Sequence, residues 1–269
     1  MSILPLADAY QTAVDDVATL AIADTVNVLN ELEGATVAET AGVLRQTLPE
    51  LTATYGEAAG VITTQYYNEV RATSSSLTTE YTPVVQSSKV VDLTQDSIGF
   101  TAAQLSKGVQ YGTVISTLAG SVQRIVNGVG RDTLAWNVVK DPDGTLYKRV
   151  PNVDACAFCR TMAAVAKPSN EYYVHFHNNC RCRSVPVFRG QEVPSFPGDE
   201  ETKKAYALAG KELERQRKEA RKEFDKKLEA RGLYTGGRAA GRAFLAANPE
   251  LTYTTKNYLR LMRQITGWR

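Results

Sequence analysis

Apolar residues recur at helical spacing over the first quarter of the chain. Between residues 6 and 32 they fall three or four positions apart, and four aspartates lie between them. This stripe predicts an amphipathic helix. Thr36 and Thr47 each precede a Glu by three residues, which is the spacing of a capping box at a helix start. We therefore expect three helices between residues 6 and 71, with Pro49 in the first turn of the third.

The pattern changes in the middle of the chain. Residues 73–88 are rich in Ser and Thr and predict a connection without helix. Residues 100–126 return to a spacing near 3.6 and predict a further helical region. Gly128 and Gly130 are natural terminators for it.

Two β-favouring runs follow, at residues 134–139 and 146–150. The segment Asp141-Pro-Asp-Gly144 lies between them. It is a turn signal because Pro fixes one φ angle and Gly supplies a positive one. The sequence predicts a β-hairpin here, which leads directly to Cys156.

A long charged helix is predicted beyond a Pro- and Gly-rich stretch. Residues 202–231 consist mainly of Lys, Arg, Glu and Ala, with a thin apolar stripe. The predicted fold is mainly α, with an N-terminal helical bundle, a small α+β domain resembling a zinc knuckle, and the charged C-terminal helix. The predicted domains are residues 1–130 (helical), 131–190 (β-hairpin and Cys/His), 191–201 (linker) and 202–269 (basic, helical).

Charge is divided unevenly along the chain. Residues 1–135 carry 6 Lys/Arg and 14 Asp/Glu, whereas residues 136–269 carry 25 and 15, so the overall charge of +2 conceals two halves of opposite sign. This asymmetry predicts an acidic part that contacts protein. The basic part is either a solvated charged helix or a surface for the DNA backbone, whose non-specific binding needs only positive charge on one face.

The composition indicates no membrane segment. Apolar runs break after a few residues, far short of the roughly 18–20 needed for a span. No basic residue precedes Arg45, so the basic start of a signal peptide is missing. We expect a protein that is assembled in a cytoplasm.

All four cysteines and both histidines lie within residues 156–182. Cys156-Ala-Phe-Cys159 has a spacing that lets a tight turn direct both sulfurs at one point, and a second group returns in His177-Asn-Asn-Cys180-Arg-Cys182. Thiolate and neutral imidazole are ligands that Zn²⁺ accepts, and a structural site needs four of them. The predicted ligands of a structural zinc are Cys156, Cys159, Cys180 and Cys182, or three of these with His177.

Other uses of these cysteines are open. Two disulfides would suit a small secreted domain, but this chain has 269 residues and no signal peptide. A redox pair would need a βαβ setting, and unrelated buried thiols are a third alternative. Catalysis is a weaker reading, because a catalytic zinc keeps an open position and has an acid nearby. Glu171 and Asp154 do not have the spacing of a general base, and we expect no enzymatic activity.

Four short segments, taken in order, carry a resemblance to a known family. They are Arg149-Val150-Pro151, Cys156-Ala-Phe-Cys159, His177-Asn-Asn-Cys180-Arg-Cys182 and Val185-Pro-Val-Phe188. This order resembles the MuF-like minor capsid (minor head) proteins of tailed bacteriophages, especially of actinobacterial hosts. The N-terminal helices, with Leu48-Pro49 and residues 65–71, are similar to the helical half of that family. The resemblance covers about residues 1–190.

The resemblance implies a virion protein, present in few copies in the head interior near the portal, that aids head assembly, DNA packaging or ejection. Its implied partners are the portal protein and the major capsid protein, with packaged DNA contacting the basic C-terminal region. The matched cysteines and His177 would be structural. Family members commonly have His-Pro where this chain has His177-Asn178, and His175 is unmatched. The alternative is a zinc-stapled DNA-binding protein or nuclease that uses one of the histidines near bound phosphate.

Overall fold

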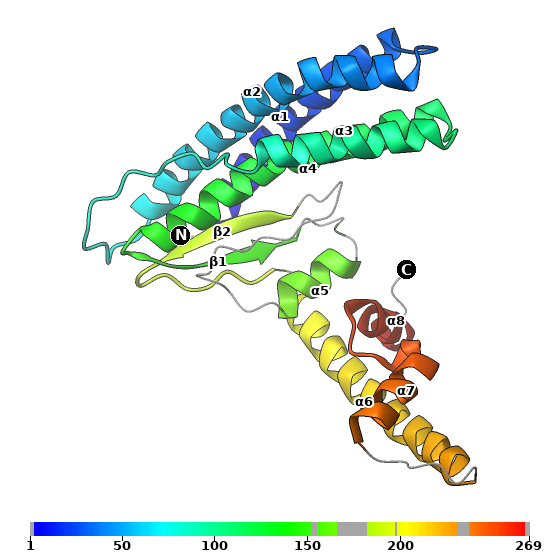
Figure 1. The fold of residues 1–269 in the computed structure, drawn as a ribbon. Coiled ribbons are helices and arrows are strands. Elements are labelled where there is room, and N and C mark those ends of the chain that lie inside the picture. The colour runs from blue at the N-terminus through cyan, green and yellow to red at the C-terminus, as the bar shows by residue number, and fades with distance from the viewer. Residues whose placement is uncertain are drawn as a thin grey trace. The chain divides into compact units, whose positions relative to one another are not determined.

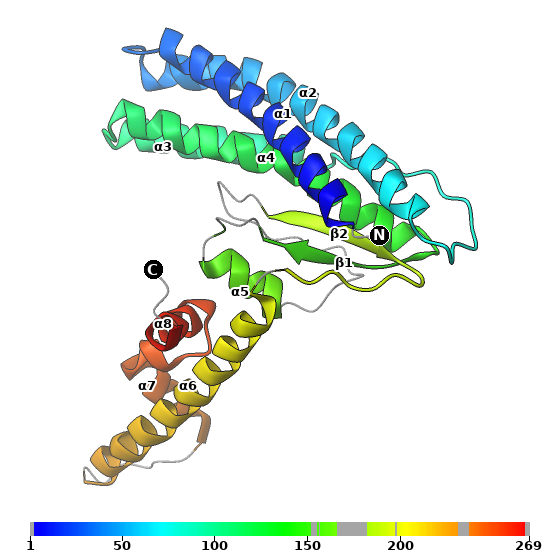
Figure 2. The same cartoon turned by 180° about the vertical axis from the view of Figure 1, so that it is seen from behind.

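The chain folds into two compact units, which Figures 1 and 2 show from opposite sides. The N-terminal unit comprises residues 1–153 and 168–195, and the C-terminal unit comprises residues 154–167 and 196–269. The described part contains eight α-helices, one short 3-10 helix and two strands, so the mainly α prediction is confirmed. The structure is a computed structural model that describes residues 3–151, 155, 157–165, 182–196, 198–230 and 237–266.

Four long helices form the body of the N-terminal unit. Figure 1 shows α1 and α2 as one helical hairpin, with α3 and α4 as a second hairpin beside it. α4 packs against each of the other three helices and is the centre of the core. The helices are α1 (Leu4–Glu31), α2 (Val37–Ala72), α3 (Val90–Ser106) and α4 (Tyr111–Lys140).

The predicted start of α2 at Thr36 is confirmed. The backbone N–H of Thr36 donates to a Glu39 carboxylate oxygen at 2.9 Å, and the N–H of Glu39 donates to Thr36 Oγ1 at 3.3 Å, which completes the capping box. The second predicted start, at Thr47, is wrong, because α2 continues through Pro49. Leu44, Leu48 and other inward positions stay buried on either side of the proline, and this packing outweighs the one missing hydrogen bond.

The predicted strand at residues 134–139 is wrong, because these residues form the last turns of α4. Leu134, Ala135 and Val138 are buried at helical spacing and face the other helices. Gly130 does not end the helix either. A Cβ atom added there would lie 2.9 Å from Thr63 Oγ1, so this glycine allows a close approach to α2. Gly128 likewise lies inside α4.

The small sheet pairs strands that are distant in sequence. β1 (Gly144–Val150) runs antiparallel to β2 (Arg183–Phe188), with Tyr147 opposite Pro186. The predicted second strand at 146–150 is therefore confirmed, but its partner is β2 and not residues 134–139. The sheet packs on α4, and β2 also contacts α1 and α2.

Residues 73–88, here called the strap, contain no regular structure before the single turn that leads into α3, as predicted. Asn137 and Thr133 of α4 fix the strap by hydrogen bonds. The Asn137 Oδ1 atom accepts from Val84 N at 2.9 Å, and Thr133 Oγ1 accepts from Gln86 N, also at 2.9 Å. The strap is therefore tied to the helical body along its length.

All of the regular structure described in the C-terminal unit is helical. It contains α5 (Ala157–Val165), α6 (Asp199–Glu229), α7 (Gly237–Ala247), a 3-10 helix (Pro249–Leu251) and α8 (Thr255–Thr266). The predicted charged helix is confirmed as α6. One face of α6 packs on α5 and α8. The core is a small apolar cluster of Ala205, Ala209, Leu213, Phe244, Leu251, Leu261 and Met262.

The observed division of the chain differs from the predicted domain boundaries. The predicted boundary at residue 130 falls inside α4, and residues 157–165 belong to the C-terminal unit. The reason is that α4 extends the first unit to the strands, so the sheet is part of that unit's core. None of the described helices combines the length and apolarity needed to cross a membrane.

Candidate functional site

Two of the five predicted metal ligands lie among the described residues. Cys159 lies on α5 and is 2% exposed, and Cys182 directly precedes β2 and is 1% exposed. The other predicted ligands, Cys156, His177 and Cys180, lie outside the described residues, as does His175. Within the described ranges, no group of three or more His, Cys, Asp or Glu side chains is arranged to hold a metal ion.

The surroundings of Cys159 and Cys182 follow from local structure. Cys159 and Ala163 are one helical turn apart and form the buried face of α5. The carbonyl of Cys182 accepts a hydrogen bond from Arg131 Nη2 of α4 at 3.3 Å, which anchors the start of β2. Cys159 belongs to the C-terminal unit and Cys182 to the N-terminal unit, and each thiol by itself has the chemistry of a zinc ligand. The zinc site stays a prediction.

Three charged side chains meet in the interior of the N-terminal unit. Arg71 at the end of α2 binds Asp141, which caps α4, with 2.8 Å between Nε and Oδ2. The Arg71 Nη2 atom lies 3.4 Å from Oδ2 of Asp143, which directly precedes β1. Both carboxylate side chains are fully buried. We call Arg71, Asp141 and Asp143 the ionic cluster.

Asp143 links the ionic cluster to the strap. Its carboxylate accepts hydrogen bonds from the backbone N–H and the hydroxyl of both Thr78 and Thr79, at 2.7–2.8 Å. These bonds, led by the one from the Thr78 hydroxyl, hold the pKa of Asp143 well below its ordinary value of 3.8. The group is charged at neutral pH, and it forms ion pairs with Arg71 and with Arg189, whose Nε lies 3.5 Å from Oδ1.

Asp141 extends the ionic cluster to an aromatic contact. It accepts a hydrogen bond from the Tyr67 hydroxyl at 3.1 Å, and the Tyr67 ring meets Phe188 of β2 edge to face at 5.1 Å. Burial raises the pKa of Tyr67 far above its ordinary value, so this hydroxyl remains a donor. The cluster thus joins α2, α4, the strap and both strands. The charged groups of the cluster bind one another and neighbouring groups of the same unit. The cluster therefore stabilises the fold.

The ionic cluster was not predicted from the sequence. The segment Asp141–Gly144 predicts a hairpin turn and gives no sign of a buried ion pair. Arg71 and Asp141 are 70 positions apart, and their pairing has no signal in local sequence. The one indication of the ionic cluster in the sequence is that two aspartates directly precede a β-favouring run.

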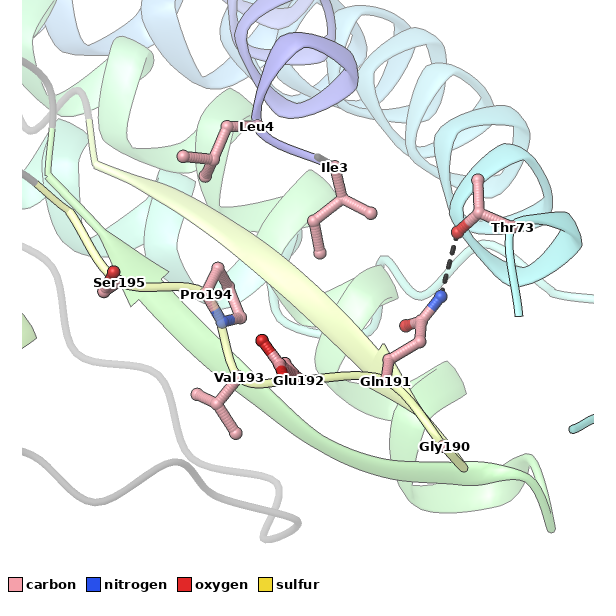
Figure 3. Close-up of a pocket in the computed structure, with 9 residues that line it drawn as sticks. All are labelled: Ile3, Leu4, Thr73, Gly190, Gln191, Glu192, Val193, Pro194 and Ser195. Atoms are coloured by element: carbon pink, nitrogen blue, oxygen red, sulfur yellow. Dashed lines mark hydrogen bonds between the residues drawn. The ribbon is translucent and has the colours of Figure 1, made fainter. Parts of the chain in front are cut away.

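A surface cavity of about 470 Å³ lies beside the start of α1 in the N-terminal unit (Figure 3). Its lining comprises Ile3, Leu4, Thr73 and residues 190–195. Gln191 Nε2 donates to Thr73 Oγ1 at 2.9 Å and fixes the segment after β2 to the end of α2. Glu192 is the single carboxylate among the described lining residues, so these residues supply no acid–base pair.

Comparison with known proteins gives one match. A family model described as VG15 protein matches residues 4–209. The matched region runs from the first residue of α1 into α6 and includes the segment with all four cysteines. No curated protein and no solved structure matches the chain. Because the match covers most of its length, the chain belongs to the VG15 protein family and is a phage protein.

Proposed function

We propose that this phage protein is a minor capsid protein of the head, located in the head interior near the portal, where it aids head assembly, DNA packaging or ejection. The observation that carries the proposal is an overlap. The VG15 match spans residues 4–209, and the segments that resemble MuF-like minor head proteins lie within the same region. Both lines of comparison therefore concern the same part of the chain.

The structure supports a role through surfaces. The N-terminal unit is built from long helices, and its charged interior groups are bound to one another in the ionic cluster. We propose the portal protein and the major capsid protein as partners, and packaged DNA as a partner of the basic C-terminal region. The Cys/His segment is proposed to hold a structural Zn²⁺, which would supply a fixed cross-link within the chain.

The proposal is tested on purified virions by quantitative mass spectrometry. We expect peptides of this protein in DNA-filled heads, in few copies relative to the major capsid protein. Protease added to intact particles should leave it uncut, whereas it should cut an exposed tail protein in the same sample. Absence from DNA-filled particles, or cleavage in intact heads, would contradict the proposed location.

Incubation with plasmid DNA separates this proposal from nuclease activity. We expect no cleavage by the purified protein in the presence of Mg²⁺, Mn²⁺ or Zn²⁺. A nuclease would be indicated by cleavage that depends on the metal and is lost in His177→Ala without loss of fold. That result would overturn the minor capsid proposal.

A further inference from the structure

A groove of about 650 Å³ lies between α6 and α7 of the C-terminal unit. Phe244 and Leu245 of α7 supply the apolar part of its wall, and Glu214 is the acidic residue of its described lining. Five cationic side chains also line the groove. We call this feature the basic groove, with the cations Arg217, Lys218, Arg221 and Lys222 of α6 and Arg242 of α7.

The two α6 arginines that line the groove, Arg217 and Arg221, lie over aromatic rings. The Arg217 guanidinium lies 4.0 Å from the ring centroid of Tyr253, and its Nη1 atom donates to the Leu251 carbonyl at 3.3 Å. Arg221 lies 5.6 Å from the ring centroid of Phe244, in the groove wall. A guanidinium fixed in this way loses less conformational entropy when it binds an anion.

Positive charge in the basic groove exceeds its local compensation. Elsewhere on α6, Arg215 binds two carboxylates, Glu212 and Glu219, each at 2.7 Å. In the groove, Lys218 lies 3.7 Å from Glu214, and Arg221 is paired with Asp225 at 2.8 Å. Lys222 and Arg242 are exposed and have no ion pair with any other described residue. An anionic partner would therefore find cations whose charge is not yet balanced.

The spacing of these cations matches a helix. Arg217 and Arg221 are four residues apart on α6, as are Lys218 and Lys222, so each pair is separated by about 6 Å along the axis. Carboxylates four residues apart on a second helix have the same separation. A helix lying along α6 can thus place two carboxylates against two cations at once.

The groove also has room beside its apolar wall. Gly241 lies in the groove lining, and a Cβ atom added there would meet no described atom within 4 Å apart from its chain neighbours and the backbone of its own helix. A partner's apolar side chain can therefore enter next to Phe244 and Leu245 without displacing the chain. A DNA backbone would satisfy the cations but would leave this apolar wall uncovered.

We propose that the basic groove binds an acidic amphipathic helix of a partner protein. Carboxylates of that helix pair with the cations of the rim, and an apolar side chain between them packs against Phe244 and Leu245. Charge complementarity brings the partner to the groove, and apolar contact selects it over other anions. This inference goes beyond the proposed capsid role and does not depend on it, and the proposed contact with packaged DNA then falls on cations of the basic C-terminal region outside the groove.

The test measures fluorescence anisotropy of a labelled synthetic helical peptide with the full-length protein. The peptide carries Glu pairs four residues apart, with Leu residues between them on one face. We expect saturable binding, and we expect binding to weaken about tenfold or more when the Leu residues become Gln, because burial of a Leu side chain contributes roughly that factor. Equal binding of the Gln peptide, or tighter binding of a DNA duplex to the same residues, would overturn the proposal.

Matched variants place the binding in the groove. Gly241→Leu fills the groove from its open wall and improves helix propensity, so the fold is kept and peptide binding should be lost. Gly99→Leu, at an equally open position of α3, is its control and should bind as the native protein does. Arg242→Glu should weaken binding, whereas Lys256→Glu, an exposed residue of α8 outside the described groove lining, should not. Unchanged binding in both Gly241→Leu and Arg242→Glu would exclude the groove as the site.

Discussion

At the scale of the single residue, Asp143 connects two parts of the N-terminal unit. It is fully buried, and its carboxylate binds Arg71 of α2 together with Thr78 and Thr79 of the strap. A buried carboxylate is tolerated when it is both paired and hydrogen-bonded, and this one is. The strap is therefore held by a charge, which makes its attachment sensitive to protonation.

Acidification should loosen this attachment. Hydrogen bonds hold the pKa of Asp143 below 3.8 in the folded state, so its contribution to the free energy of unfolding is complete above that value and is lost as pH falls through the folded pKa. The variant Asp143→Asn has no carboxylate at this position, so it lacks this contribution at every pH. We expect the variant to have a lower Tm than the native protein at pH 7, and the difference to shrink below about pH 4.

Thermal unfolding between pH 2 and 7 measures this difference directly. Because the two proteins differ at one side chain, the pH dependence of their difference in Tm reports on the Asp143 carboxylate and the groups that it contacts. A difference in Tm that stays constant across this pH range would contradict the assignment of a charged, stabilising Asp143.

At the scale of the element, two glycines inside α2 mark close contacts with neighbouring segments. A Cβ atom added at Gly60 of α2 would lie 2.4 Å from Val85 Cγ1 of the strap. One added at Gly56 would lie 2.9 Å from Val129 Cγ2 of α4. Both positions allow neighbouring segments to approach α2 closely. This close packing accounts for glycine at these two positions of a long helix, despite its low helix propensity.

Two substitutions of the same kind should act in opposite directions. Gly60→Ala should destabilise the protein by about 1–3 kcal/mol, because the β-branched Val85 cannot move aside without disturbing the strap. Gly99→Ala on α3 meets open space, so it should stabilise by up to about 1 kcal/mol through helix propensity. Urea denaturation of both variants provides the measurement. A Gly60→Ala protein as stable as the native one would show that the strap adapts to the larger residue.

At the scale of the whole molecule, the two units differ in how they use charge. Among its described residues, the N-terminal unit buries two arginines, a lysine and two aspartates, which are Arg71, Arg131, Lys148, Asp141 and Asp143. The C-terminal unit has a small apolar core and carries its charges on the surface of α6, largely as pairs three or four residues apart. Surface pairs of this kind contribute little to stability, so they leave the charges available to partners.

Metal content tests the zinc prediction for the chain as a whole. We expect the purified protein to contain about one zinc per chain by elemental mass spectrometry, and chelation to lower its Tm, since metal binding contributes to folding free energy. Cys156→Ser should lose the metal, whereas His175→Ala, outside the predicted ligand set, should keep it. A protein without metal and without titratable thiols would instead contain disulfides.

Features that depend on a few neighbouring residues could be predicted from the sequence. They include the capping box at Thr36, the strap at 73–88, the second β-favouring run and the charged helix α6. For the candidate site, cysteine spacing identifies thiols that can share a metal ion, and the zinc site that it predicts stays a prediction. Of these thiols, Cys159 and Cys182 are buried in the structure.

The sequence by itself determined a mainly α protein with these local signals, because capping, turn chemistry and helical spacing act within a few positions. Only the tertiary structure decided that α2 continues through Pro49, that α4 runs to Lys140 and that β1 pairs with β2. The same is true of the contact between Arg71 and Asp141. In each case the deciding energy is burial against residues tens of positions away, and local propensity is the weaker term.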